Sequence, residues 1–374
     1  MFVRAAVSAA AALALAAPPA LAAPPRVQAP AYIVENVTTG DVLAQHAAGS
    51  RRAIASITKL MTVIVTLQNA NPTDVVTVRE DAADVGESTI HLRAGEKITV
   101  RQLIEAALIQ SANDAADALA DFVGRGDTRA FVTLMNVEAR RLGLRDTHFV
   151  RPDGLDAPGH LSSARDVLAL ARVAMRYPLV RQIVRRRTAT ITGGRTLYTW
   201  NDLLGHFPGL LGVKTGHTGA AGWCQVAAAR RRGSTTYAVV LGDPTRTQRN
   251  ADLAALLRWG ISRYRLRTVI APRTVFARVV SGYGRSPLEL VADAALRRPV
   301  RVDRSLVAQI VAPSTVSLPV TRGQRVGEIR VTSGDRLVGV RALVAAWSVS
   351  RPSFLGRVGW YTARTFRNIG GWLP

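Results

Sequence analysis

The sequence predicts a mixed α/β (α+β) fold, an antiparallel sheet with a helical insertion, followed by a small all-β domain. Residues 31–264 have short alternating runs typical of strands at both ends, with apolar residues at helical spacing between them. From about residue 269 only short alternating runs remain, separated by Gly and Pro. Strands on both sides of a helical middle indicate one sheet that both ends of the first segment build.

Local patterns justify each element of the first segment. Residues 31–35 and 41–45 flank a Thr-Thr-Gly-Asp turn and predict two strands. Apolar residues at helical spacing predict a helix over 57–67. Ser163 and Asp166 resemble a capping box that begins a helix over 167–177. The other expected elements are helices at 103–109, 115–123, 129–141 and 249–264, and strands at 188–192, 195–199, 209–215, 223–229 and 235–241.

The second segment contains six short alternating runs and no obvious pair of nucleophile and base. We therefore expect it to act as a spacer or a binding module. Its strands are expected at 274–280, 288–291, 300–302, 307–311, 326–331 and 337–344. The chain then has four expected parts: a signal peptide at 1–22, a catalytic domain at 23–268, an all-β domain at 269–350 and an amphipathic helix at 351–374.

The first 22 residues predict a secretory signal peptide. Arg4 precedes a short run of Ala and Leu that Pro18 and Pro19 interrupt, and Ala20-Leu21-Ala22 forms an A-x-A cleavage site. The alternative is an uncleaved anchor, although the apolar run is short for a membrane span. We expect the protein to be exported to the extracytoplasmic face of a bacterial plasma membrane.

The C-terminal residues predict an amphipathic helix. On a helical wheel, aromatic and aliphatic side chains occupy one side and polar side chains the other. The apolar side has Phe354, Leu355, Val358, Tyr361, Phe366, Ile369, Trp372 and Leu373, and the polar side has Arg357, Arg364, Arg367 and Asn368. This pattern is typical of a helix that lies in the interface of an anionic membrane. The alternative is a helix that packs on the protein's own core.

Arginine supplies nearly all of the positive charge. The chain has 49 basic and 26 acidic residues, a net charge of +23, and its only lysines are Lys59, Lys97 and Lys214. For an exported protein the expected anionic partners are lipids and wall polymers, and not nucleic acid. Cys224 is the only cysteine, which excludes an internal disulfide and a cysteine-rich metal site.

The scarcity of lysine draws attention to Lys59, which follows Ser56 by three residues at the start of a predicted helix. This spacing places both side chains on one helical face. Unlike arginine, a desolvated lysine can lose its proton and act as a base. A serine hydroxyl needs such a base to become a nucleophile. Ser56 and Lys59 are therefore a candidate catalytic pair.

A second lysine lies in the run Lys214-Thr215-Gly216 on a predicted strand. Lys214 and Thr215 would offer a cation and a hydroxyl to a carboxylate, and Gly216 would allow a ligand to approach the backbone. Proximity to Lys214 would also favour the neutral form of the other lysine. Between these motifs, Ser111 and Asn113 lie at a predicted break between helices, where a turn would direct both side chains into a cleft.

The motifs S-x-x-K, S-x-N and K-T-G occur in this order, as they do in penicillin-binding proteins and class A β-lactamases. The chain resembles low-molecular-mass penicillin-binding proteins, the serine-type D-alanyl-D-alanine carboxypeptidases. Residues 145–155, 159–166 and 214–222 are also similar to that family, and the resemblance covers about 31–264. It implies a serine β-lactamase/transpeptidase-like catalytic domain with a second domain and a membrane anchor. Arg151 departs from the family pattern, which usually has Asn before Pro.

The resemblance also implies a mechanism for cleaving peptidoglycan stem peptides. Ser56 would attack the carbonyl between the last two D-alanines, with Lys59 as general base. The backbone N–H groups of Ser56 and His217 would hold the oxyanion, and Ser111 and Lys214 would relay a proton to the departing D-alanine. Water would then hydrolyse the acyl enzyme, and β-lactam antibiotics would inhibit it. This scheme needs no cofactor and no metal.

Substrate binding would use three further groups. By the same resemblance, Asn113 would orient the substrate amide and Thr215 would bind the terminal carboxylate, with Gly216 and His217 beside it. An arginine would help, and the position before the final helix favours Arg249, with Arg246 as the second choice.

Several alternatives stay open. A DD-endopeptidase has the same motifs, and a β-lactamase is disfavoured because no E-x-x-L-N run occurs. A catalytically silent wall-binding protein could retain the fold. A Ser-His-Asp site using His217 is disfavoured because no serine lies in a G-x-S-x-G run. The diamino acid of the stem peptide and the oligomeric state cannot be derived from the sequence.

Overall fold

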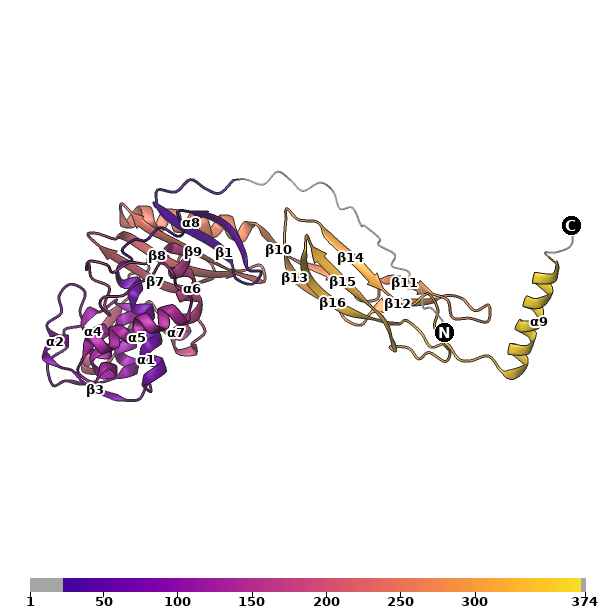
Figure 1. Ribbon diagram of the computed structural model, residues 1–374, viewed down its shortest axis with the longest axis horizontal. Coiled ribbons are helices and arrows are strands. Elements are labelled where there is room, and N and C mark those ends of the chain that lie inside the picture. Colours follow the sequence, from indigo (N-terminus) through magenta and orange to yellow (C-terminus); the bar gives the residue numbers. More distant parts are fainter. Residues whose placement is uncertain (1–22, 371–374) are drawn as a thin grey trace. The chain divides into compact units, whose positions relative to one another are not determined.

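A computed structural model describes residues 23–370, which form two compact units (Figure 1). The catalytic unit ends at Ser262 and the β unit begins at Arg263. The predicted boundary after residue 268 is therefore wrong. Strand β10 (Tyr264–Ile270) pairs with β13 (Leu296–Arg301), so these residues belong to the second unit. The expected signal peptide, residues 1–22, lies outside the described residues.

Within the described part of the catalytic unit, five strands form one antiparallel sheet in the order β2-β1-β9-β8-β7. The strands are β1 (Ala31–Asn36), β2 (Asp41–His46), β7 (Leu210–Thr218), β8 (Gly222–Arg231) and β9 (Ser234–Asp243). Ala31 pairs with Leu241, so the first strand of the unit lies beside the last. This confirms the predicted sheet built from both ends of the segment, and it leaves β7 as an edge strand.

Helices cover both faces of this sheet (Figure 1). Helix α8 (Arg246–Ser262) packs Leu253 and Leu257 against Val240 and its neighbours on one face. The larger helical layer packs on the other face and contains most of the core. It consists of the 3₁₀ turn η1 (Ala55–Thr58) and helices α1 (Lys59–Asn69), α2 (Glu80–Ala83), α3 (Val100–Ile109), α4 (Asn113–Gly124), α5 (Thr128–Arg141), α6 (Ala164–Ala174) and α7 (Pro178–Ile183).

Capping groups move several boundaries away from the predicted ones. Thr99 and Gln102 form a capping box, so α3 begins earlier than the apolar pattern indicates. The Ser163 side chain accepts a hydrogen bond from the Asp166 N–H and starts α6. Two small two-stranded antiparallel sheets complete the unit: β3 (Val75–Thr77) with β4 (Lys97–Thr99), and β5 (Thr188–Thr190) with β6 (Thr196–Tyr198).

The β unit contains a five-stranded antiparallel sheet in the order β11-β12-β16-β15-β14, within the residues that the structure describes. The strands are β11 (Val275–Val279), β12 (Leu288–Ala292), β14 (Leu306–Val311), β15 (Arg325–Ser333) and β16 (Arg336–Ala345). Leu288, Leu290, Ile329 and Leu343 are among the buried side chains that form its core. The small all-β domain is therefore confirmed, with β10 added at its start.

The last element is helix α9 (Phe354–Gly370). Trp360 and Tyr361 contact the Tyr283 ring edge-on, with ring centroids 5.4 and 6.3 Å away. The side chains of Phe354 and Leu355 are exposed. The side chains of Phe366 and Ile369, and residues Trp372 and Leu373, lie outside the described part. Among the described helices, none has the length and apolar character needed to cross a bilayer.

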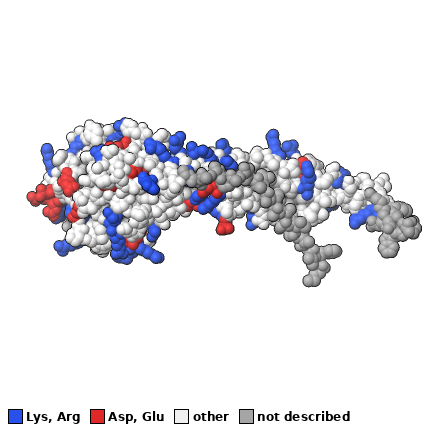
Figure 2. Space-filling model, turned by 90° about the horizontal axis from the view of Figure 1, so that it is seen from above, with Lys and Arg blue, Asp and Glu red and all other residues white. Residues whose placement is uncertain are grey.

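Basic side chains occur in several small groups over the face shown in Figure 2. The two arginine triplets, Arg185 to Arg187 and Arg230 to Arg232, are exposed, as expected for solvated surface charges. On this face the positive charge is thus distributed over the surface.

Candidate active site

The nucleophile candidate lies in the short 3₁₀ turn η1, directly before α1. Ala55 has φ = 49°, a left-handed conformation that is uncommon outside glycine and that turns the chain sharply before Ser56. Lys59 begins α1 and is buried. Its Nζ lies 2.8 Å from Ser56 Oγ, 2.6 Å from Asn113 Oδ1 and 2.7 Å from the Asp153 carbonyl oxygen. The sequence spacing therefore places Ser56 and Lys59 in direct contact.

Burial lowers the pKa of Lys59 from 10.5 to about 8, while nearby carboxylates, Asp153 first, act in the opposite direction. As an ammonium, Lys59 has three N–H groups for its three oxygen partners. As a neutral amine it keeps two, and Asn113 Oδ1 and the Asp153 carbonyl can only accept. The lone pair then faces Ser56, whose hydroxyl has a hydrogen to donate. The arrangement thus directs proton transfer from Ser56 to Lys59.

The loop beneath Lys59 is held by a buried ion pair. Arg151 donates two hydrogen bonds of 2.6 Å to the Asp153 carboxylate, which is fully buried, and the Leu155 N–H donates a third. These partners and Lys59 hold the pKa of Asp153 below its usual value in spite of its burial. Asp117 lies in the same network, and burial and Asp153 raise its pKa to about 8. Arg151, the departure from the family pattern, compensates this buried negative charge.

Gly154 allows this loop to touch the nucleophile turn. It has φ = 87°, and a Cβ atom there would lie 2.2 Å from the Ala55 carbonyl oxygen. His160 holds the nucleophile turn through Thr58. Its Nδ1 accepts a hydrogen bond from the Val150 N–H, so the proton of the neutral ring is on Nε2, which donates to Thr58 Oγ1 at 2.8 Å. Burial lowers the pKa of His160 to about 4, so the neutral imidazole braces η1 at neutral pH.

Strand β7 supplies the second lysine. Lys214 is buried, and its Nζ donates to Ser111 Oγ at 2.8 Å and to the Thr215 carbonyl oxygen at 2.9 Å. Burial lowers the pKa of Lys214 well below its usual value, and the charges of Lys59 and Arg249 lower it further. Ser111 itself has φ = 67°, which directs its hydroxyl towards the cleft. The structure thus pairs each of the two buried lysines with a serine.

Gly216 lines the cavity, and its missing side chain also has a structural role that was not expected. A Cβ atom at this position would lie 2.8 Å from the Ile54 carbonyl oxygen and 3.1 Å from the Ser56 nitrogen. The missing side chain therefore makes room for the chain's own nucleophile turn. Glycine at this position brings β7 into contact with η1, and so brings Lys214 close to Lys59.

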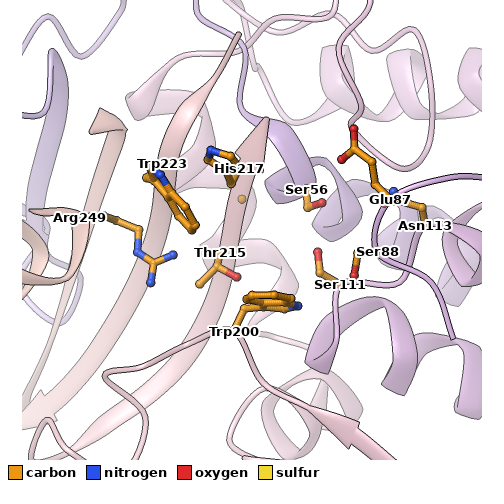
Figure 3. Close-up of a pocket in the computed structure, with 11 residues that line it drawn as sticks. Ser56, Glu87, Ser88, Ser111, Asn113, Trp200, Thr215, His217, Trp223 and Arg249 are labelled. Carbon is orange, nitrogen blue, oxygen red and sulfur yellow. The ribbon is translucent and has the colours of Figure 1, made fainter. Parts of the chain in front are cut away.

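The two serines, Ser56 and Ser111, line a cavity of about 200 Å³ (Figure 3). Thr215 and Arg249 lie towards one end of it, and Glu87 and Asn113 towards the other. Arg249 is buried, and burial lowers its pKa to about 10. Arg246 forms a two-pronged ion pair with Asp202, which Arg249 also contacts at 3.1 Å, but Arg246 is not among the residues that line this cavity. The geometry favours Arg249 over Arg246 as the carboxylate-binding arginine.

Two tryptophans that line the cavity, Trp200 and Trp223, were not predicted as part of the site. The His217 ring stacks on Trp223, with centroids 4.0 Å apart, and the Arg249 guanidinium lies 5.5 Å from the Trp223 ring centre. Trp200 also lines the cavity, and its Nε1 donates to the Gln110 carbonyl oxygen. No motif marks either tryptophan, because long-range folding alone brings them to the cleft. The only hint in the sequence concerns Trp223, which follows the K-T-G run by seven residues.

A buried lysine in contact with a serine, beside the edge strand of an antiparallel sheet, defines the class: an active-serine enzyme that works through an acyl intermediate. Comparison of the chain with known proteins identifies the family within this class. The family model for D-alanyl-D-alanine carboxypeptidase matches residues 19–245. The chain belongs to this family.

Named relatives agree with this assignment. The chain is 32% identical over 357 residues to the D-alanyl-D-alanine carboxypeptidase DacA of Escherichia coli, covering 91% of this chain and 88% of that one. It is 29% identical to DacF of Bacillus subtilis over 85% of both chains. The crystal structure of DacD from Francisella tularensis matches with a TM-score of 0.64 at 27% identity, covering 88% and 95%. That of the Streptomyces K15 DD-transpeptidase matches with a TM-score of 0.61 at 33% identity, covering 64% and all of that chain.

Proposed function

We propose that the protein is a penicillin-sensitive serine carboxypeptidase that removes the terminal D-alanine from peptidoglycan stem pentapeptides. The observation that carries this proposal is the Lys59 amine, which contacts Ser56 Oγ at 2.8 Å and has a pKa lowered to about 8. Such a group is a competent base near neutral pH. Membership of the D-alanyl-D-alanine carboxypeptidase family supports the choice of substrate.

The substrate backbone extends along β7, because an edge strand has open N–H and C=O groups for another extended chain. Thr215 and Arg249 bind the terminal carboxylate at one end of the cleft. Asn113 holds the amide that precedes the scissile bond. This orientation sets the carbonyl of the penultimate D-alanine in front of Ser56.

Ser56 Oγ attacks that carbonyl carbon while its proton moves to Lys59, and the Ser56 and His217 N–H groups stabilise the oxyanion. When the C–N bond breaks, Ser111 gives its proton to the leaving amine, and the proton taken from Ser56 replaces it through the lysines. D-alanine leaves as a neutral amine and Ser56 remains as an ester. Water then hydrolyses the ester and restores the hydroxyl.

Intact mass of the purified full chain after addition of benzylpenicillin tests this proposal. We expect a persistent adduct of one penicillin on the wild type, none on Ser56→Ala, and the wild-type result on the matched control Ser88→Ala, which lines the same cleft. Release of D-alanine from a stem pentapeptide is then measured. An adduct that disappears while the drug is consumed would favour a β-lactamase. No adduct on folded protein would favour a catalytically silent wall-binding protein.

We further propose that the protein is exported and that α9 holds it on an anionic membrane surface, on the extracytoplasmic side. The signal-peptide pattern of residues 1–22 supports export. Exposed Phe354, Leu355 and Val358 on α9, with Arg357 and Arg364 nearby in the sequence, suit a helix in the interface.

Flotation with vesicles tests the membrane proposal. We expect the full chain to float with vesicles that contain phosphatidylglycerol and much less with pure phosphatidylcholine. Leu355→Glu should weaken flotation, whereas Leu337→Glu, at an exposed leucine of the β unit, should not. Equal flotation of both variants with the wild type would contradict a role for α9.

A further inference from the structure

Glu87 places a carboxylate at the end of the catalytic cleft that lies away from Arg249 (Figure 3). The residue is exposed and lines the cleft with Ser56 and Asn113. Among the described residues, none forms a hydrogen bond or an ion pair with this carboxylate. It is also close enough to Lys59 to raise the pKa of that amine. A carboxylate in this position is open to a cationic group of a bound substrate.

The backbone around Glu87 is fixed by the same asparagine that contacts Lys59. Asn113 Nδ2 donates to the Gly86 carbonyl oxygen at 2.9 Å, and the Asn113 N–H donates to the Ser88 carbonyl oxygen at 2.6 Å. The Ser88 hydroxyl donates to the Gln110 carbonyl oxygen. Between these anchors Glu87 has φ = 64°, a left-handed conformation that costs a non-glycine residue about 1 kcal/mol. The surrounding hydrogen bonds therefore impose the position of Glu87 at the cleft.

The cleft is thus polarised along the direction of the bound peptide. Thr215 and Arg249 lie at the end that receives the terminal carboxylate, and Glu87 lies beside Asn113 at the end where the rest of the peptide leaves. The residue whose carbonyl Asn113 holds is the one that precedes the two D-alanines. In a stem peptide this residue is a diamino acid. A side chain of four methylene groups brings an amine about 6 Å from its Cα.

We propose that Glu87 binds the side-chain ammonium of the diamino acid that precedes the two D-alanines. This inference rests on the proposed function and names the form of stem peptide that the cleft selects. A stem with a free amine has the charge that Glu87 attracts. A cross-linked stem has lost that charge, because its amine has become an amide. The protein therefore acts on uncross-linked stems in preference to cross-linked ones.

Two tripeptides test the inference on the purified full chain: Nα-acetyl-L-Lys-D-Ala-D-Ala, and the same peptide with its ε-amine acetylated. Exposed ion pairs in proteins contribute little, so we expect the free amine to raise kcat/KM about fivefold in the wild type. Glu87→Gln should bring the ratio of the two peptides close to one. Asp84→Asn removes a charge from an exposed residue nearby that does not line the cleft, and it should keep the wild-type ratio.

Two further measurements make the result independent of the variants and of turnover. In the wild type, 0.5 M NaCl should reduce the preference, because salt screens exposed charges. Each peptide is also measured as a competitor of Ser56 acylation by benzylpenicillin, which gives the same ratio without hydrolysis. A wild-type ratio near one, or an unchanged ratio in Glu87→Gln, would overturn the inference. Failure to release D-alanine from either peptide, with Ser56 still acylated, would overturn the proposed function instead, and the competition ratio would still decide the role of Glu87.

Discussion

In the catalytic unit Lys59, Lys214 and Asp153 are buried, whereas the buried polar side chains described in the β unit are Arg263, Ser281 and Ser333. All three lysines and all six histidines of the chain precede residue 263. From residue 263 onwards every basic residue is an arginine. The difference teaches that this chain uses arginine where a permanent charge is sufficient, and lysine at the two buried positions where a proton must leave.

One pair of matched contacts makes the difference concrete. Arg151 and Asp153 in the catalytic unit, and Arg301 and Asp303 in the β unit, have the same spacing and the same two-pronged geometry. The Asp153 side chain is fully buried, whereas that of Asp303 is 20% exposed. The same two residue types therefore meet different solvation. Loss of the arginine leaves a buried charge in the first case and a solvated one in the second.

The largest expected effect separates the two basic residue types. Lys59→Arg keeps the charge but removes the base, because a guanidinium does not lose its proton. We expect acylation by benzylpenicillin to slow by about 10²- to 10⁴-fold, the usual contribution of a general base. The matched change in the β unit, Arg330→Lys in an exposed ion pair with Glu328, should leave the rate unchanged. A fast Lys59→Arg variant would contradict the assignment of the base.

The pH dependence of acylation sharpens the same contrast. Only the neutral Lys59 amine accepts a proton, and its pKa is lowered to about 8, so the neutral fraction falls as the pH falls below that value. Well below pH 8 the rate should fall about tenfold for each pH unit, and from pH 8 to pH 6 it should fall roughly 50-fold, because about half of Lys59 is already protonated at pH 8. Stopped-flow acylation measures it, with circular dichroism showing that the protein stays folded. A constant rate from pH 6 to pH 8 would exclude this base.

A smaller effect is expected from the matched arginines. Arg151→Gln should lower the free energy of unfolding of the catalytic unit by about 2 kcal/mol, because it leaves the buried Asp153 without its charged partner. Arg301→Gln should cost less than about 1 kcal/mol, since Asp303 remains partly solvated. Urea unfolding followed by circular dichroism gives both values, and the urea concentration at which Ser56 acylation is lost identifies the catalytic unit. Equal losses would contradict the role given to burial.

The strands, the helical insertion and the contact between Ser56 and Lys59 could be predicted from the sequence, because each depends on the spacing of residues that are close together in the chain. Ser56 and Lys59 are one helical turn apart, so their contact follows from the helix itself. The predicted domain boundary after residue 268 was wrong because strand pairing decides it: Tyr264 pairs with Arg301, far along the chain, so the second unit already begins at Arg263. The apolar pattern of helix α8 continues to residue 264, so the sequence alone does not show that the helix ends at Ser262.

Other parts of the site could not be predicted from the sequence because their positions depend on contacts with residues far along the chain. Trp200 and Glu87 lie in loops whose course is set by hydrogen bonds to distant residues, such as Gln110 and Asn113. The contact of Gly216 with Ile54 is equally non-local. A glycine in a motif does not say which partner needs the space. Arg151 could be flagged as unusual, but its role depends on the burial of Asp153, which only the fold reveals.

The pairing of Ala31 with Leu241 has a consequence for timing. Strand β1 has no partner on this side until β9 exists, and Lys214 reaches Ser111 only when β7 docks on the nucleophile turn. Non-local pairing of this kind is a late event in folding, because a long loop must close first. Ser56 therefore becomes reactive towards penicillin only after the last strands are in place. The rate of labelling by the drug during refolding thus reports the completion of folding.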